Sequence, residues 1–317
     1  CSNLTDFFIF YLRNKENFDK MIRFKIFKIN ISYIFHLFRK NTIKGAKKNI
    51  RAHYDMGNDF FEEWLDSNMQ YSSAHFERDN QTLEEAQKNK FKKLENYLSL
   101  NDGEKLLEIG CGWGTLSQYL FNNNQIDIDA ITISKEQLSF VKKLNIKDSF
   151  NNCSFDIKDY RNLFTNYNKI ISIEMIEAVG EKYLPLYLRK IRECTRDDGF
   201  AIIQGITISD KKYKEYSNQV DFIQKYIFPG GFLPSKDTLI KKANDEGLDV
   251  QIIEDLNSSY VRTLRLWRER FNQKWPKIKT MGYDEKFSRI WNYYLSYCEA
   301  GFSEKSIFVS VFKLTPK

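Results

Sequence analysis

Residues 106–114 read Leu106-Leu-Glu-Ile-Gly-Cys-Gly-Trp-Gly114, a short apolar run that ends in three glycines at alternate positions. The apolar run predicts a buried strand over Lys105–Ile109, and a helix is expected after Gly114. Glycines in a turn of this kind let the backbone approach a ligand closely. A turn that needs its glycines only for packing is the alternative interpretation.

The class of ligand follows from the glycine spacing and from one acidic residue. The glycines follow the pattern GxGxG, whereas the dinucleotide fingerprint is GxGxxG. Glu108 lies on the predicted strand just before the turn. A carboxylate there would repel a pyrophosphate and attract a cationic amine. S-adenosylmethionine carries such an amine and no phosphate, so the turn favours this cofactor over NAD.

The segments around the turn predict an α/β fold. Short apolar runs alternate with longer amphipathic segments, which is typical of a parallel sheet with helices on both faces. Ahead of the first strand, Thr82 and Glu85 predict a capping box for a helix over residues 83–98. The expected strands are Lys105–Ile109, Asp129–Ile133, Ser154–Ile157, Lys169–Ile173, Phe200–Ile206 and Ile307–Leu314.

Polar residues follow the second and third of these strands. Thr132, Ser134 and Gln137 come after the second strand, where hydroxyl and amide groups suit the ribose and the methionine part of the cofactor. Asp159 and Tyr160 come after the third strand, where a carboxylate can accept from the adenine amino group and a ring can stack on adenine. Each could instead be a cap or a surface loop, but the carboxyl ends of successive parallel strands meet in one crevice.

Length and composition exclude several classes of protein. A chain of 317 residues with 42% hydrophobic residues can build a large core. No apolar stretch reaches the roughly 18 residues that span a bilayer. The five cysteines stand far apart, without a CxxC pair or a Cys/His cluster, so we expect neither a metal site nor a disulfide framework. Reduced thiols fit a cytoplasmic location.

Positive charge is concentrated near the beginning of the chain. Residues 1–50 contain 11 Lys and Arg against 3 Asp and Glu, together with ten aromatic residues, while the net charge of the whole chain is +7. We expect residues 1–48 to form a basic, aromatic helical arm, and the chain, which begins with Cys1, to be a fragment whose upstream part is missing. Docking on the main domain, contact with an anionic lipid surface and nucleic-acid binding are the three interpretations of this arm, in that order.

The main domain is expected to span residues 49–317 and departs from the alternating pattern in one place. A long segment of about 211–280 precedes the last strand, and it contains Tyr226-Ile-Phe-Pro-Gly-Gly-Phe-Leu-Pro-Ser235. A long connection of this kind is more often functional than a linker. We therefore expect an apolar insertion that encloses the substrate.

Six longer motifs resemble the cyclopropane-fatty-acyl-phospholipid synthase family, which includes the mycolic acid cyclopropane synthases. The resemblance covers about residues 49–314, and the arm resembles the tail of the N-terminal lipid-binding domain of the family. The motifs are His53–Phe61, Tyr71–Phe76, Leu106–Gly114, Glu174–Gly180, Tyr226–Ser235 and Tyr293–Phe302.

The resemblance implies the fold and adds to the cofactor site. It implies a class I S-adenosylmethionine-dependent methyltransferase fold, which is Rossmann-like, with a seven-stranded sheet whose last strand is antiparallel. Together with the strand ends described above, it gives a set of expected cofactor-binding residues. These are Tyr71, Ser72, Leu106, Glu108, Gly110, Cys111, Gly112, Trp113, Gly114, Thr132, Ile133, Ser134, Gln137, Asp159, Tyr160 and Arg161.

The resemblance also implies a bicarbonate ion beside the transferred methyl group, bound in the family by a Glu, a His, a Tyr and a backbone amide. The matching Glu is Glu177 and the matching Tyr is Tyr294, but the His position holds Gln204. Ser73 stands where better-known members have Cys, and Ala178 where they have His. The chain therefore resembles a Ser/Gln variant subset, in which cofactor binding is expected to be intact and the last proton transfer is in question.

Cys298 matches a cysteine that has been proposed as catalytic in the family. A buried core thiol is the simpler interpretation and the one we favour, because the chemistry needs no thiolate. The expected catalytic set is Glu177, Tyr294, Gln204, Ser73 and Cys298, with Glu177 as the base.

The resemblance predicts an enzyme that forms a cyclopropane ring at the cis double bond of an unsaturated phospholipid acyl chain, with S-adenosylmethionine as cofactor. The alternatives are a methylene or methyl branch on the acyl chain, methylation of a small-molecule amine, and a binding protein with a decayed site. The expected partner is unsaturated phospholipid, met by a peripheral enzyme at the cytoplasmic face of the cell membrane. A homodimer is one option, and no nucleic acid is expected because the charge excess avoids the predicted cofactor domain.

Overall fold

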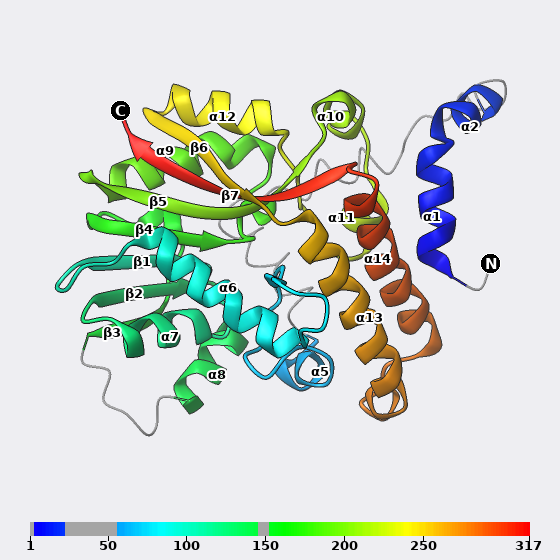
Figure 1. Ribbon diagram of the computed structural model, residues 1–317, viewed down its shortest axis with the longest axis horizontal. Coiled ribbons are helices and arrows are strands. Elements are labelled where there is room, and N and C mark those ends of the chain that lie inside the picture. Colours follow the sequence, from blue (N-terminus) through cyan, green and yellow to red (C-terminus); the bar gives the residue numbers. More distant parts are fainter. Residues whose placement is uncertain (1–2, 23–55, 145–151) are drawn as a thin grey trace.

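The computed structural model describes residues 3–22, 56–144 and 152–317, and it contains one seven-stranded sheet in the order β3-β2-β1-β4-β5-β7-β6 (Figure 1). The strands β1 to β5 pair in parallel, while β7 is antiparallel to both β5 and β6. This confirms the antiparallel last strand and the Rossmann-like α/β class. The strands are β1 (Lys105–Ile109), β2 (Asp127–Thr132), β3 (Cys153–Ile157), β4 (Tyr167–Ile173), β5 (Thr195–Ile208), β6 (Leu248–Asp255) and β7 (Ile307–Pro316).

Helices cover both faces of the sheet because the central strands are apolar on both sides. In β5, Phe200 and Ile202 point into one apolar core, whereas Ala201 and Ile203 point into the other. The first core is shared with α6, α7, α13 and α14, and the second with α9 and α12. The helices are α1 (Leu4–Arg13), α2 (Lys15–Ile22), α5 (Asn58–Glu62), α6 (Leu83–Leu98), α7 (Thr115–Asn123), α8 (Lys135–Leu144), α9 (Leu184–Cys194), α10 (Asp210–Tyr216), α11 (Phe222–Tyr226), α12 (Lys236–Asp245), α13 (Asn257–Thr280) and α14 (Glu285–Ser303).

Local sequence signals predicted several elements closely. The first strand has the predicted bounds, and α6 begins with the predicted capping box, in which Thr82 accepts from the backbone of Glu85 and Glu85 accepts from that of Thr82. The fifth strand begins at Thr195, earlier than the predicted Phe200, because the polar residues 196–198 gave no apolar signal. The expected strands at 129–133, 154–157 and 169–173 match β2, β3 and β4 with shifted ends.

The predicted insertion over residues 211–280 needs a correction. Its middle part contains α12 and the edge strand β6, which pairs with β7 along the sheet and belongs to the main fold. The sequence did not reveal β6 because an edge strand with one solvent face alternates apolar residues with Asp249, Gln251 and Glu254. Two parts of this segment depart from the common strand–helix pattern. The first contains α10, α11 and the 226–235 loop before α12, and the second is the long helix α13 after β6.

The first described helix docks on the main domain, which agrees with the first of the three interpretations of the arm. The helix α1 runs along α14 (Figure 1). Phe8 is buried against the rings of Tyr293 and Tyr297, and the hydroxyl of Thr5 donates to Glu299 at 2.9 Å. The rest of the arm after residue 22 lies outside the described residues. No described helix is long and apolar enough to cross a bilayer.

The glycine turn after β1 has the backbone conformation that its sequence suggested. All three glycines have φ between +54° and +82°, a region that other residues rarely adopt. A Cβ atom at Gly114 would lie 2.8 Å from side-chain atoms of Phe155 and Val141. Around Gly112, by contrast, a Cβ atom would meet no atom within 4 Å. The third glycine therefore serves helix packing, and the second leaves the backbone open.

This difference predicts the effect of two alanine substitutions. Gly114→Ala should lower the free energy of unfolding by about 3 kcal/mol, because strain at positive φ adds to a steric clash. Gly112→Ala is the matched control and should cost about 1 kcal/mol, since only the φ strain applies. Urea unfolding of both variants measures the difference, and equal losses would contradict the packing role of Gly114.

Candidate functional site

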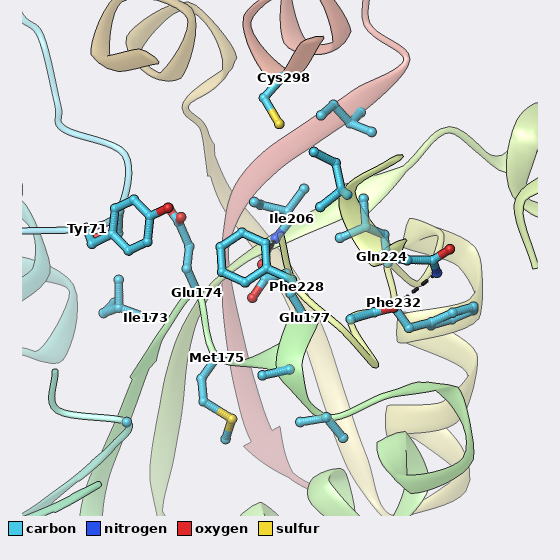
Figure 2. A pocket seen from close by; sticks show the side chains of 18 of the residues that line it. Tyr71, Ile173, Glu174, Met175, Glu177, Ile206, Gln224, Phe228, Phe232 and Cys298 are labelled. Carbon is cyan, nitrogen blue, oxygen red and sulfur yellow. Dashed lines mark hydrogen bonds between the residues drawn. The ribbon is translucent and has the colours of Figure 1, made fainter. Parts of the chain in front are cut away.

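A cavity of about 530 Å³ opens at the carboxyl ends of β1, β2 and β4 and extends toward α10, α11 and α14. One end is formed by the glycine turn and the ends of the next strands. The other end is lined by apolar and aromatic side chains from the 226–235 loop, α13 and α14. Figure 2 shows Phe228 and Phe232 of this loop beside Glu177 and Ile206. Part of the segment 211–280 thus lines the cavity, and the expectation that it encloses a substrate stays a prediction.

Most of the residues predicted to bind the cofactor line one end of this cavity. They come from the 69–72 loop, the glycine turn, the end of β2 and the short helix after β3. Those that line it are Tyr71, Ser72, Glu108, Gly110, Cys111, Gly112, Trp113, Thr132, Ile133, Gln137, Asp159, Tyr160 and Arg161.

Three predicted cofactor residues do not line the cavity, and for these the structure corrects the prediction. Leu106 points into the core of the sheet. Gly114 packs against Phe155 and Val141. Ser134 accepts from the backbone N–H of Gln137 at 3.3 Å and so orders the loop rather than lining the space.

The acidic residue before the glycine turn fits a cationic ligand. Glu108 lines the cavity and is buried, and it accepts a hydrogen bond from the hydroxyl of Ser117. Burial raises the pKa of its carboxyl to about 7. A cationic amine at this point would favour the ionised form, because an opposite charge compensates the lost hydration. Together with the open backbone at Gly112, these residues fit S-adenosylmethionine.

Asp159 is closely paired with Arg161. Its two oxygens accept from Nε and Nη2 of the guanidinium at 2.8 and 2.7 Å. The carboxylate therefore fixes the arginine at the cavity wall, and the adenine contact of Asp159 remains a prediction. Tyr160 lines the same wall, with its ring edge-on to that of Tyr187.

Glu174 is the functional residue that the sequence analysis missed. It follows β4 directly and has φ +47°, an unusual conformation for a residue other than glycine. Its Oε1 accepts from the backbone N–H of Ser73 at 2.8 Å and from Nε2 of Gln204 at 2.7 Å. Its Oε2 accepts from the hydroxyl of Tyr260 at 2.7 Å. This buried carboxylate lines the cavity with three donors from three separate segments.

The predicted base, Glu177, also lines the cavity but is less well satisfied. Its Oε1 accepts from the backbone N–H of Ile206, while its buried Oε2 has no hydrogen-bond partner in the described part of the chain. Burial, and then the neighbouring charge of Glu174, raise its pKa to about 8. Burial also raises the pKa of Glu174, but its three donors oppose that shift. Glu174, with three donors against one for Glu177, is therefore the member of the pair whose negative charge is better stabilised.

The other predicted catalytic residues fall into two groups. Ser73 and Gln204 do not line the cavity, which corrects their place in the expected catalytic set and the expectation that Gln204 holds a bound ion. The backbone N–H of Ser73 and the side-chain amide of Gln204 both donate to Glu174. Tyr294 does line the cavity, but its hydroxyl lies 3.0 Å from the hydroxyl of Tyr71 and has no hydrogen bond to a glutamate among the described residues. The tyrosine hydroxyl that donates to Glu174 is that of Tyr260, and the contact of Tyr294 with a bound ion stays a prediction.

Cys298 lines the cavity beside the aromatic wall (Figure 2). Burial raises the pKa of its thiol well above its usual range. A neutral thiol of this kind is a packing group rather than a nucleophile. This agrees with the core-thiol interpretation.

Lys90 is a second residue that the sequence analysis missed. It is 2% exposed, and its ammonium donates to Oε1 of Gln70 at 2.9 Å and to Oγ of Ser72 at 2.8 Å. Burial lowers its pKa to about 8, while Asp66 and Glu174 are the nearest charges that oppose the shift. The available signal was its position on the buried face of an amphipathic helix, which α6 presents to the sheet.

Among residues 3–22, 56–144 and 152–317, no three His, Cys, Asp or Glu side chains are grouped so that they could bind a metal ion. The cavity is lined by carboxyl, hydroxyl, aromatic and aliphatic groups, among others.

Comparisons with known proteins point to one family. Residues 41–312 match the family model described as mycolic acid cyclopropane synthetase. The tuberculostearic acid methyltransferase UfaA1 of Mycobacterium tuberculosis is 36% identical over 85% of the chain and 65% of its own length. The cyclopropane-fatty-acyl-phospholipid synthase of Escherichia coli is 34% identical over 86% of the chain and 68% of its own length. The chain thus spans about two thirds of the length of these curated relatives.

A solved structure extends this likeness to the fold. The mycolic acid cyclopropane synthase CmaA1, complexed with SAH and CTAB, superposes with a TM-score of 0.79 and 28% identity, over 84% of this chain and 97% of that protein. S-adenosylhomocysteine (SAH) is the product of methyl donation by S-adenosylmethionine, and CTAB is a long-chain detergent. That relative therefore binds a nucleoside and an alkyl chain on the same fold.

The raised pKa of Glu177 predicts how stability changes with pH. An acid with a folded-state pKa of about 8 instead of about 4.5 costs stability as pH rises from 4.5 to 8, because only the unfolded chain releases the proton in that range. Glu177→Gln should remove this cost, so its stability relative to the wild type should grow by up to about 1.4 kcal/mol per pH unit. Urea unfolding at several pH values measures it, with Glu62→Gln, at an exposed position of α5, as control. Parallel curves for Glu177→Gln and the wild type would contradict the prediction.

Proposed function

The chain belongs to the mycolic acid cyclopropane synthetase family, and from this premise we propose that it is an S-adenosylmethionine-dependent enzyme that adds a one-carbon unit to the double bond of a lipid acyl chain. The preferred substrate is an unsaturated phospholipid and the preferred product is a cyclopropane ring. A methylene or methyl branch is the second outcome. The name of the tuberculostearic acid methyltransferase, a relative, supports a fatty-acyl methyl product as the alternative.

One observation carries this proposal: a single cavity joins the cofactor end to an apolar, aromatic space, and two buried carboxyl groups lie between them. A small-molecule amine would need a polar or anionic pocket around its nitrogen. Here the distal wall consists mainly of Phe228, Phe232, Tyr297 and aliphatic residues. Such a wall suits an alkyl chain, because burying each methylene contributes about 0.8 kcal/mol.

When bound, S-adenosylmethionine supplies an electrophilic methyl group. The protein has to orient the double bond toward it and to exclude water, because a carbocation in the acyl chain would otherwise be hydrated. Aromatic faces stabilise a cation without attacking it, and the rings of Tyr71, Phe228, Tyr260 and Tyr294 line the central part of the cavity. In the 226–235 loop, the backbone N–H of Phe232 donates to the backbone carbonyl of Glu177. This loop closes one side of the space.

We assign the last proton transfer to Glu174. Ring closure requires a base that takes one proton from the transferred carbon, and a carboxylate whose charge is stabilised by three hydrogen-bond donors suits this step. The side-chain amide of Gln204, which stands at the histidine position implied for bicarbonate, and the backbone N–H of Ser73 both donate to Oε1 of Glu174. In this proposal a carboxylate of the chain itself takes the role of the bound ion. Glu177 is the second, protonated carboxyl of the pair.

The arm and its surroundings support a proposal about location. Phe7 and Phe10 of α1 are 49% and 57% exposed, although both are large apolar residues. Tyr226 of α11 is exposed as well, and its ring packs on Phe222, which contacts α14. Exposed aromatic residues beside basic ones suit the surface of an anionic membrane. We place the enzyme peripherally at the cytoplasmic face of the cell membrane.

The proposed function predicts turnover that depends on unsaturation. The chain with S-adenosylmethionine should release S-adenosylhomocysteine in the presence of unsaturated phospholipid vesicles, and the product lipid should gain one CH2 per modified chain. Saturated vesicles with the same head groups and a panel of free amines are the controls. Mass spectrometry and nuclear magnetic resonance of the product distinguish a ring from a methylene or methyl branch. Turnover with amines and none with lipid would overturn the proposal.

The role of Glu174 can be tested by removal and by replacement. Glu174→Gln should lower turnover at least about 100-fold, because general-base catalysis is lost, while binding of S-adenosylmethionine stays within a few-fold. Glu174→Gly suits the positive φ at this position and leaves room for a small anion, so added formate or bicarbonate should restore part of its rate. The same anions should not rescue the Gln variant, because its amide fills the space. Full turnover of Glu174→Gln together with loss in Glu177→Gln would identify Glu177 as the base instead.

A further inference from the structure

The far end of the cavity is different in character from its centre. Beyond Phe228 and Phe232 the cavity passes between α10, the end of the arm helix α1 and the start of β7. Here two lysines, Lys15 at the start of α2 and Lys212 in α10, join the lining. The apolar space that we propose for an acyl chain thus ends at a pair of ammonium groups.

The two lysines have different partners. Nζ of Lys15 lies 3.2 Å from each carboxylate oxygen of Glu215. Nζ of Lys212 donates to the hydroxyl of Ser306 at 2.7 Å, and no described carboxylate lies within ion-pair distance of it. Burial, and then the positive charge of Lys15, lower the pKa of Lys212. The negative charge of Glu215 opposes this shift. The ammonium of Lys212 is therefore half-buried, with the Lys15–Glu215 pair nearby and a neutral hydroxyl as its hydrogen-bond partner.

A second carboxylate, that of Asp221, lines this part of the cavity in addition to that of Glu215. Asp221 caps α11, where its carboxylate accepts from the backbone N–H of Gln224 at 2.8 Å. Burial raises its pKa, and no lysine contributes to that shift. This end of the cavity thus contains two ammonium groups and two carboxylates. Glu215 is paired with Lys15 and Asp221 caps α11, so among the described residues Lys212 is the ammonium group here without a carboxylate within ion-pair distance.

We propose that Lys212, assisted by Lys15, binds the anionic group at the head of the lipid substrate, either a carboxylate or a phosphodiester. The inference rests on the proposed function, because it requires an acyl chain in the apolar part of the cavity. A half-buried ammonium attracts an anion more strongly than a fully hydrated ammonium does, because less water screens the two charges. With the head group fixed at the mouth, the distance to Glu174 determines which carbon of the chain reaches the reaction point.

The neighbouring residue in the same helix supplies a matched control. Lys211 carries the same charge one position away, but its side chain is exposed and does not line the cavity. Lys212→Met removes the ammonium and keeps an apolar stem of similar length, and Lys212→Arg keeps the charge. Lys211→Met reports the effect of losing one surface charge in α10.

Binding of simple amphiphiles to the full chain tests the inference without turnover. Calorimetric titration should use dodecyl phosphate and laurate as the anionic probes and dodecyl maltoside, which has the same alkyl chain, as the neutral one. Lys212→Met should weaken binding of an anionic probe about tenfold and leave the neutral probe unchanged, while Lys211→Met and Lys212→Arg stay within about twofold of the wild type. Loss for the phosphate alone identifies a phospholipid head group, and loss for laurate alone identifies a free fatty acid.

Three results would overturn the inference. The affinity for both anions is unchanged in Lys212→Met, the neutral probe weakens as much as the anions, or Lys211→Met has the same effect as Lys212→Met. Failure of the proposed function can be recognised separately. In that case the wild type shows no turnover on any unsaturated lipid, and this result does not depend on which probes the variants bind. Where wild-type turnover is present, KM for the anionic substrate should rise in Lys212→Met with kcat unchanged.

Discussion

The buried carboxylate of Glu174 is the interaction on which the rest of the site depends. It is bonded to the 71–74 loop through Ser73, to β5 through Gln204 and to α13 through Tyr260. A buried charge is tolerated only while its donors stay in place, and the loss of one costs several kcal/mol. One side chain therefore connects the loop at the cofactor end, the sheet and the helix that covers the aromatic part of the cavity.

A second charge balances the first. The negative charges of Glu174 and Glu108 stabilise the ammonium of Lys90. Its hydrogen bonds to Gln70 and Ser72 connect it to the loop that lines the cofactor end. An ammonium buried without such carboxylates would lose its proton, and the carboxylates without it would be harder to ionise. The acidity of Glu108 at one end of the cavity and that of Glu174 between the two ends are thus coupled through one lysine in α6.

The sequence predicted the parts of this arrangement that depend on local pattern. Apolar runs, the capping box at Thr82 and the glycine turn each involve neighbouring residues, so the central strands and the cofactor end could be placed without coordinates. The edge strand β6 was missed because its exposed face breaks the apolar run. Glu174 and Tyr260 were missed because 86 residues separate them, and only the folded chain brings the hydroxyl to the carboxylate. The resemblance led to Glu177 and Tyr294, which line the same cavity but do not contact each other in this way.

A base that belongs to the chain constrains the outcome of the reaction more than a diffusible ion would. Glu174 cannot follow the cation along the acyl chain, because three donors fix both of its oxygens. It removes a proton only from the carbon that the cavity places against it. In the proposed mechanism, ring closure follows when the transferred carbon loses its proton while the charge is still on the far carbon of the former double bond. A methylene branch follows when the same carbon loses its proton after a hydride shift has moved the charge to its neighbour, and an internal double bond beside a methyl branch follows when a chain carbon is deprotonated instead. The position of the chain therefore selects the carbon that is deprotonated, and the timing of the hydride shift decides between a ring and a methylene branch.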